Sequence, residues 1–152
     1  MSAQRVVGRR MASVLVADDE DGLRRSLCDL LGDFGFRVIG EAANGSDAVT
    51  LSKRLAPDIA LLDLRMPVLD GIGAARLIKE ETPSVQVVIL TAYDDESLRH
   101  EAEEAGVYCY LVKGCSPGLM RDILTRASAW GAGLPPPRPR QIVPSGESDQ
   151  AV

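Results

Sequence analysis

The stretch that decides the fold reads DIALLDLRMPVLDG and spans residues 58–71. Its first half is a short apolar run without polar alternation, which predicts a strand buried on both faces of a sheet. Asp63 ends that run, and the letters RMPVLDG that follow predict a loop before the next helix. A carboxylate therefore stands where a buried strand gives way to a loop.

Short β-branched runs alternate with helical patterns on both sides of this stretch. Four further strands are predicted, with the letters SVLVAD, RVIGEA, VQVVILTA and VYCYLVK. Helices are predicted at about 23–34, from the turn Asn44-Gly45 to Leu55 with Ser46 as its cap, at about 72–81, within DDESLRHEAEEAG, and from Ser116-Pro117 to about Trp130. Strand and helix thus follow each other five times.

This alternation predicts an α/β fold of the flavodoxin-like, doubly wound (βα)5 type. Continuous apolar strands indicate a five-stranded parallel sheet with helices on both faces, in the order 2-1-3-4-5. The domain is expected over 13–130, which suits a chain of 152 residues with 45% hydrophobic content. Residues 1–12 lack periodicity and are expected to form a mobile arm. The proline-rich residues 131–152 are expected to form a disordered tail.

Composition argues against several classes of protein. The formal net charge of -5 provides no general positive field for a nucleic-acid backbone. The three cysteines, Cys28, Cys109 and Cys115, are odd in number and form no C-x-x-C pair, which favours a reducing cytoplasm over a disulfide or zinc framework. No apolar run approaches the roughly 20 residues that span a bilayer. We therefore expect a cytoplasmic protein without a membrane partner.

Polar side chains end four of the predicted strands: Asp18-Asp19, Asp63, Thr91 and Lys113. Singly, each has an ordinary explanation as a cap, a loop carboxylate or a solvated charge. In a doubly wound sheet, however, the carboxyl ends of the strands share the edge where ligands bind. Three carboxylates in one place repel one another unless a cation lies among them, and an all-oxygen set suits Mg²⁺ better than zinc. The sequence predicts a Mg²⁺ site that receives a phosphate.

These residues resemble the receiver domains of bacterial response regulators, the chemotaxis regulator CheY included. The resemblance covers about residues 13–130 and rests on motifs in the order of that family: Asp18-Asp19, Asp63 with Met66-Pro67 and Asp70-Gly71, Thr91-Ala92, and Tyr110 three residues before Lys113. The strings TAYDDE and YLVKG, followed by Ser116-Pro117, look most like receivers of the NarL/LuxR type.

The resemblance implies that Asp63 takes a phosphoryl group from a phosphohistidine of a sensor histidine kinase. It implies that Asp19 and Asp63 bind Mg²⁺ directly, Asp18 binds it through water, and the main-chain carbonyl of Arg65 completes the set. Such a protein is not an enzyme toward other substrates, because it catalyses only its own phosphorylation and dephosphorylation.

The same resemblance gives roles to the other strand-end residues. Lys113 would pair with Asp63 and later with a phosphoryl oxygen, and Thr91 would donate a hydrogen bond to the phosphoryl group. Tyr110 would turn inward as Thr91 moves, which changes the surface that a partner reads. The chain departs from the family at Gly114, where many receivers carry proline, and Tyr93 with Arg65 is expected to flank the path of an attacking water.

Four functions are compatible with this pattern. The first is a phosphoacceptor that signals by binding an unknown downstream protein, with a second copy of this chain as another candidate partner. The second is the receiver of a NarL/LuxR-type DNA-binding regulator without its output domain, since residues 131–152 offer no basic helical set for specific DNA binding. The third is a phosphate-independent pseudo-receiver. An aspartyl phosphatase ranks last, because Arg65 stands where such enzymes carry a second aspartate.

Overall fold

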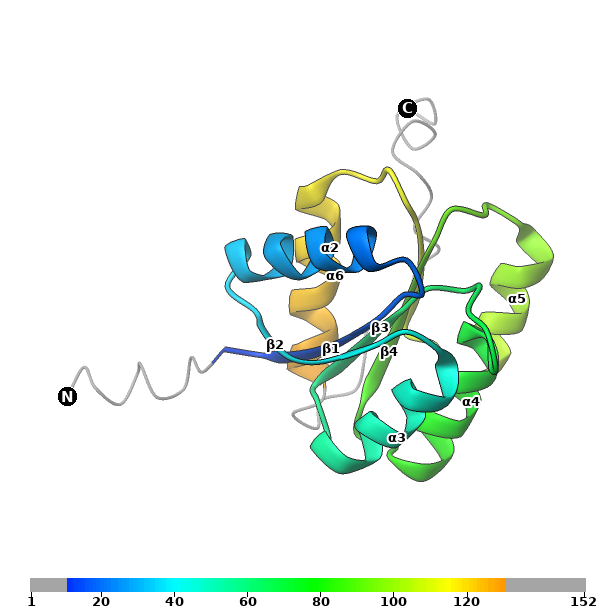
Figure 1. Ribbon diagram of the computed structural model, residues 1–152. Coiled ribbons are helices and arrows are strands. Elements are labelled where there is room, and N and C mark those ends of the chain that lie inside the picture. The colour runs from blue at the N-terminus through cyan, green and yellow to red at the C-terminus, as the bar shows by residue number, and fades with distance from the viewer. Residues whose placement is uncertain (1–10, 131–152) are drawn as a thin grey trace.

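The five strands form one parallel sheet, as the sequence predicts (Figure 1). This computed structural model describes residues 11–130. The strands lie in the order β2-β1-β3-β4-β5 and are β1 (Ser13–Ala17), β2 (Arg37–Ala42), β3 (Ile59–Leu62), β4 (Gln86–Thr91) and β5 (Cys109–Val112). The predicted order 2-1-3-4-5 is therefore confirmed. The predicted arm and tail lie outside the described residues, except that the carbonyl of Ala12 accepts a hydrogen bond from the Arg37 amide at 2.9 Å.

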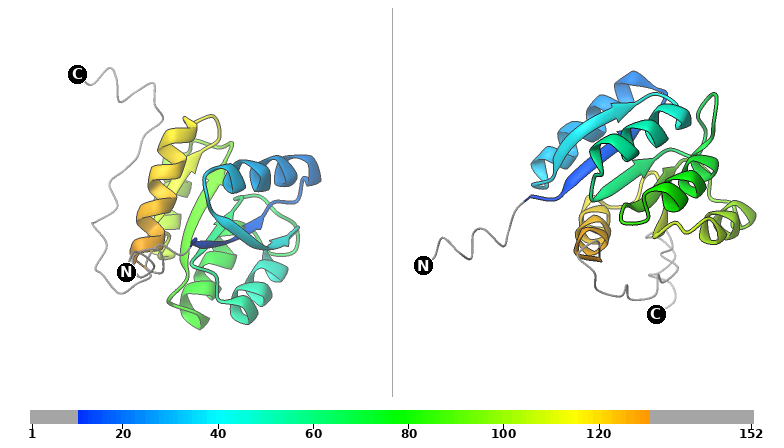
Figure 2. Two further views of the ribbon diagram at one scale, coloured as in Figure 1. Left: turned by 90° about the vertical axis from the view of Figure 1, so that its left-hand side faces the viewer. Right: turned by 90° about the horizontal axis from the view of Figure 1, so that it is seen from below.

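Helices cover both faces of this sheet. Figure 1 shows α2 (Asp21–Asp33) and α6 (Pro117–Trp130) on one face, and Figure 2 shows the same arrangement from two further sides. The opposite face carries α3 (Gly45–Leu55), α4 (Gly71–Glu81) and α5 (Glu96–Glu104). Among residues 11–130, no helix is both long and apolar enough to cross a membrane.

Strand β1 shows why the central strands read as continuous apolar runs. All five of its residues are buried. Leu15 and Ala17 face the core under α3, α4 and α5, whereas Val14 and Val16 face the core under α2 and α6. Successive side chains of a strand point to opposite faces, so the four residues from Val14 to Ala17 are all apolar, while the buried hydroxyl of Ser13 donates a hydrogen bond to Asp58.

Helix starts follow local capping chemistry, and one predicted cap is wrong. The side chain of Asn44 accepts a hydrogen bond from the Asp47 amide at 2.8 Å, so Asn44 rather than Ser46 caps α3. Asn44 has extended backbone angles outside the helix, which let its side chain turn back, while Ser46 already lies inside the first turn. The predicted cap at Ser116 is confirmed, because its Oγ accepts from the Leu119 amide at 3.1 Å.

The loop between β3 and α4 packs tightly against the end of β3. The amide of Gly71 donates to the carbonyl of Leu64 at 2.8 Å, and a Cβ on Gly71 would lie 2.3 Å from the carbonyl oxygen of Asp63. The loop also contains Val68, which has a positive φ of 71° and is 82% exposed. The backbone that carries Asp63 thus rests directly on the first turn of α4.

Replacing Gly71 by alanine tests this close approach. We expect Gly71→Ala to lower the free energy of unfolding by about 1–3 kcal/mol, because the methyl group forces two backbone segments apart. A methyl group on Gly22, in α2, would meet no atom of another segment within 4 Å, so Gly22→Ala should raise stability by up to about 1 kcal/mol through helix propensity. Urea unfolding of both variants measures the difference, and equal effects would contradict the packing argument.

Candidate functional site

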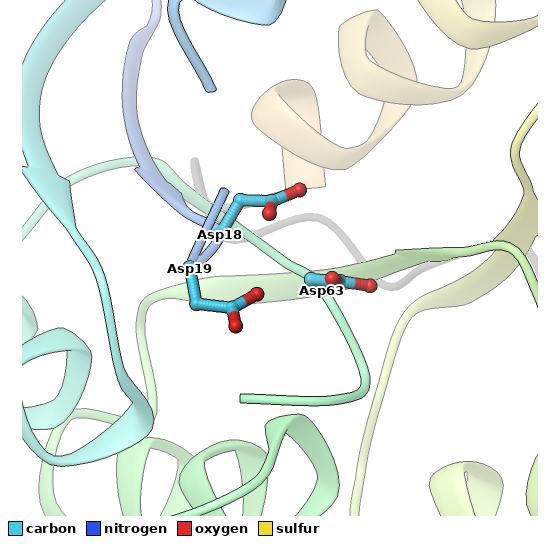
Figure 3. A group of neighbouring side chains, drawn as sticks. All are labelled: Asp18, Asp19 and Asp63. Carbon is cyan, nitrogen blue, oxygen red and sulfur yellow. The ribbon is translucent and has the colours of Figure 1, made fainter. Parts of the chain in front are cut away.

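Three carboxylates meet at the carboxyl edge of the sheet. Asp18 and Asp19 follow β1 and Asp63 follows β3, and each offers an oxygen within 4.8 Å of the others (Figure 3). Asp18 is buried, Asp63 is partly buried and Asp19 is exposed. The structure therefore brings together the three acidic residues that the sequence singles out.

Main-chain hydrogen bonds extend the sheet up to these carboxylates. The Asp63 amide donates to the carbonyl of Ala17 at 2.9 Å, and the Asp18 amide donates to the carbonyl of Ala42 at 3.0 Å. One oxygen of each of these two side chains is then fixed locally: Asp18 Oδ1 accepts from the Glu20 amide at 2.9 Å, and Asp63 Oδ1 accepts from the Leu64 amide at 2.8 Å. Asp18 and Asp63 are therefore held at the sheet edge by main-chain hydrogen bonds.

Lys113 reaches this group from the end of β5. Its Nζ lies 3.3 Å from Asp18 Oδ2, to which it donates a hydrogen bond, and 3.7 Å from Asp63 Oδ2. The ammonium group is thus nearer to Asp18 than to Asp63, the partner that the family resemblance implies. One ammonium group against three ionised carboxylates leaves two formal negative charges, and oxygen donors with such an excess suit a hard divalent cation.

The site disfavours an ionised Asp63 when no cation is bound. Burial raises the pKa of Asp63 above its usual range, and the charges of Asp18 and Asp19 raise it further. The ammonium group of Lys113 and the hydrogen bond from the Leu64 amide oppose this rise in pKa without cancelling it. A divalent cation among the three carboxylates would remove this penalty, so the donor set fits Mg²⁺.

Thr91 and Tyr110 lie on neighbouring strands of the sheet, one at the end of β4 and one in β5. Thr91 is buried, and its carbonyl accepts from the Lys113 amide at 2.7 Å. Tyr110 is also buried, and its hydroxyl donates to the carbonyl of Tyr93 at 2.6 Å. The guanidinium of Arg99, in α5, lies 4.9 Å from the Tyr110 ring centroid. Tyr110, to which the family resemblance gives a switch role, therefore points inward in this structure.

Several other residues take less central places. The Arg65 guanidinium lies over the Tyr93 ring, 4.4 Å from its centroid, so the two residues expected to flank the path of an attacking water contact each other. Gly114 has a φ of 100°, which glycine adopts without strain. His100 is exposed and lies 3.3 Å from Glu104 in the next turn. Cys109 is buried, and this burial raises the pKa of its thiol to about 12.

Residues 14–125 match the family model described as the response regulator receiver domain. The chain belongs to this family. The transcriptional regulatory protein LnrK of Bacillus subtilis is 37% identical over 134 residues, which cover 88% of this chain and 61% of LnrK. The chemotaxis protein CheY of Thermotoga maritima is 34% identical over 115 residues, which cover 76% of this chain and 96% of CheY.

Solved structures agree with this membership. The signal receiver domain of the response regulator NarL from Mycobacterium tuberculosis superposes with a TM-score of 0.72 at 28% identity, covering 82% of this chain and 99% of that one. The predicted resemblance to CheY and to NarL-type receivers is therefore confirmed. The chain contains a receiver domain of two-component signalling, and it spans only 61% of the length of LnrK.

The raised pKa of Asp63 gives this receiver domain a testable pH dependence. A carboxyl group whose folded-state pKa is raised stabilises the fold below its ordinary pKa of 3.8, and that contribution is lost as the pH rises through the folded-state value. Without divalent cations, Asp63→Asn should therefore unfold at a higher temperature than the wild type at pH 7. This difference should vanish below about pH 3.8, where the wild-type carboxyl is also neutral.

Thermal unfolding across this pH range, with Asp29→Asn on the exposed face of α2 as the control, measures the effect. Mg²⁺ should raise the unfolding temperature of the wild type more than that of Asp63→Asn. A lower unfolding temperature for Asp63→Asn at pH 7 would show that burial does not penalise the ionised group.

Proposed function

We propose that Asp63 is the phosphoacceptor of this receiver domain and that it takes its phosphoryl group from a phosphohistidine of a sensor histidine kinase in the cytoplasm. The observation that carries the proposal is the meeting of Asp18, Asp19 and Asp63 with Lys113 at one edge of the sheet. A lone carboxylate at a strand end would not by itself indicate phosphoryl transfer. This set, by contrast, supplies a nucleophile, oxygen donors for a cation and a positive charge together.

The cation is Mg²⁺ in this proposal. Asp18 has both oxygens engaged, one by the Glu20 amide and one by Lys113, which supports contact with the ion through water. Asp19 is exposed and would bind directly, together with Asp63. The main-chain carbonyl of Arg65 is the remaining proposed ligand. When bound, the ion offsets the negative charge of the phosphoryl group and its acceptor.

The transfer itself is a displacement at phosphorus. A carboxylate oxygen of Asp63 forms the new bond to phosphorus as the bond to the histidine nitrogen breaks, and the imidazole leaves with that electron pair. Lys113 then contacts a phosphoryl oxygen as a compact positive charge, and the Thr91 hydroxyl donates a hydrogen bond to another. Water later hydrolyses the aspartyl phosphate, so the domain catalyses only these reactions of its own side chain.

The proposed output is a change in the face formed by α5, β5 and α6. The Tyr110 hydroxyl donates to the carbonyl of Tyr93, which lies two residues after Thr91. A movement of Thr91 toward the phosphoryl group therefore pulls on this hydrogen bond, which keeps Tyr110 inside. Tyr110 is buried in this conformation, which is the inward position that the family resemblance gives it when Thr91 moves. The reader of this face is a downstream protein or a second copy of this chain.

Phosphoryl transfer to Asp63 is directly measurable. Incubation with Mg²⁺ and acetyl phosphate should add one phosphoryl group to the intact mass of the wild type and of Asp29→Ala, an exposed carboxylate variant, but none to Asp63→Ala. Chelation of Mg²⁺ should prevent the gain. An unmodified wild type, under conditions that label another receiver domain, would favour the phosphate-independent pseudo-receiver instead.

Substitution of Lys113 should separate the acceptance of a phosphoryl group from the conformational change that follows it. Lys113→Ala should still accept phosphate but about 10- to 100-fold more slowly, the usual effect of one lost charge-assisted hydrogen bond. The phosphate-induced change in amide hydrogen exchange over residues 92–95 and 108–114 should be absent. Lys53→Ala, whose exposed ammonium lies 3.8 Å from Glu81, serves as the matched control. A normal exchange change in Lys113→Ala would disprove the role assigned to this residue.

A further inference from the structure

Arg24, in the first turns of α2, contacts three separate parts of the chain. Its guanidinium donates to the carbonyl oxygen of Asp18 at 2.7 Å, to Glu41 Oε1 on β2 at 3.0 Å, and to Asp21 Oδ1 at 2.8 Å. Only 16% of its side chain is exposed. The hydrogen bond to Glu41 raises the pKa of Arg24 above its already high ordinary value, so the group stays charged.

The carbonyl that Arg24 holds belongs to the peptide that joins Asp18 to Asp19. Strand β1 ends at Ala17, and beyond it the Asp18 amide still pairs with the carbonyl of Ala42. The Asp18 carbonyl binds a guanidinium in a fixed fork geometry, with Glu41 on the neighbouring strand as the second anchor. The plane of this peptide sets the directions in which the two carboxylates leave the backbone.

Helix α2 gives the acidic turn little other support. The residue before its first turn, Glu20, makes no capping hydrogen bond with its side chain. The turn is closed instead by Asp18 Oδ1 accepting from the Glu20 amide and by the bond from Arg24 to the Asp18 carbonyl. Because α2, β2 and the end of β1 meet at one guanidinium, its loss would free the peptide between the two acids.

We propose that Arg24 is a positioning residue that aims the Asp18 and Asp19 carboxylates at the divalent cation. This inference rests on the proposed function, since it assumes that these carboxylates hold Mg²⁺. Two effects of Arg24 on Mg²⁺ affinity have opposite signs. As a positive charge near a cation site it weakens binding, whereas as a fixed donor to the Asp18 carbonyl it strengthens binding by holding the ligands in place.

The charge-conserving variant Arg24→Lys separates these two effects. Lysine keeps the positive charge and the aliphatic stem, but its ammonium lacks the planar fork that spans Asp18 and Glu41. If Arg24 positions the ligands, the dissociation constant for Mg²⁺ should rise about 10-fold, the lower end of the loss found for partners that orient metal ligands. Arg25→Lys, at the neighbouring exposed position of α2, should bind Mg²⁺ like the wild type.

The experiment is a titration of the whole chain with Mg²⁺, followed by the amide chemical shifts of residues 18–20 and 63–64, with thermal unfolding measured in parallel. Arg24→Gln, which removes the charge, should also bind more weakly, although repulsion alone predicts tighter binding. As a single variant, Glu41→Gln should weaken Mg²⁺ binding. Combined with Arg24→Lys, it should weaken Mg²⁺ binding no further than Arg24→Lys alone.

Wild-type affinity in folded Arg24→Lys, or tighter binding in Arg24→Gln, would overturn the positioning role and leave the proposed phosphoacceptor intact. The amide chemical shifts of Asp63→Asn should not respond to Mg²⁺. If those of the wild type do not respond either, the metal site itself is overturned and this inference with it. If Arg24→Gln does not fold, the comparison of Arg24→Lys with Arg25→Lys decides between the two outcomes.

Discussion

The parallel pairing of β1 with β3 is the constraint on which the rest of the structure depends. It continues past the last apolar residues, through the bond from the Asp63 amide to the Ala17 carbonyl, and so carries two acidic segments into one place. Like charges gathered at a half-buried edge are costly, and within residues 11–130 a single ammonium group, from Lys113, meets two of them. The fold therefore creates an excess of negative charge, which a cation or the positive charge of a partner can offset.

The sequence predicted the fold well because its main signal is periodic and local. Continuous apolar strands such as β1 required cover on both faces, and the strict alternation with helices left few topologies open. The cap of α3 was misassigned because Asn44 and Ser46 are both good capping residues, and backbone angles rather than composition choose between them. Boundaries of this kind are decided by a few dihedral angles.

The site was predictable as a set of strand-end residues, but its contacts were not. The shorter distance from Lys113 to Asp18 than to Asp63 depends on how far each side chain rises from the sheet edge. The role of Arg24 depends on α2, β2 and the end of β1 meeting at one point, which sequence spacing does not encode. The stack of Arg65 on Tyr93 likewise joins two loops that are distant in the chain.

Val68 is a position where a substitution can change the stability of this domain without changing its acidic site. A β-branched residue in left-handed backbone costs about 1–2 kcal/mol, and this one has its side chain in solvent, where packing offsets little of that cost. The loop tip is thus a place where a glycine or asparagine could relax the backbone without touching the acidic edge. Homologous chains could differ in thermal stability through this position alone while the residues of the acidic edge stay the same.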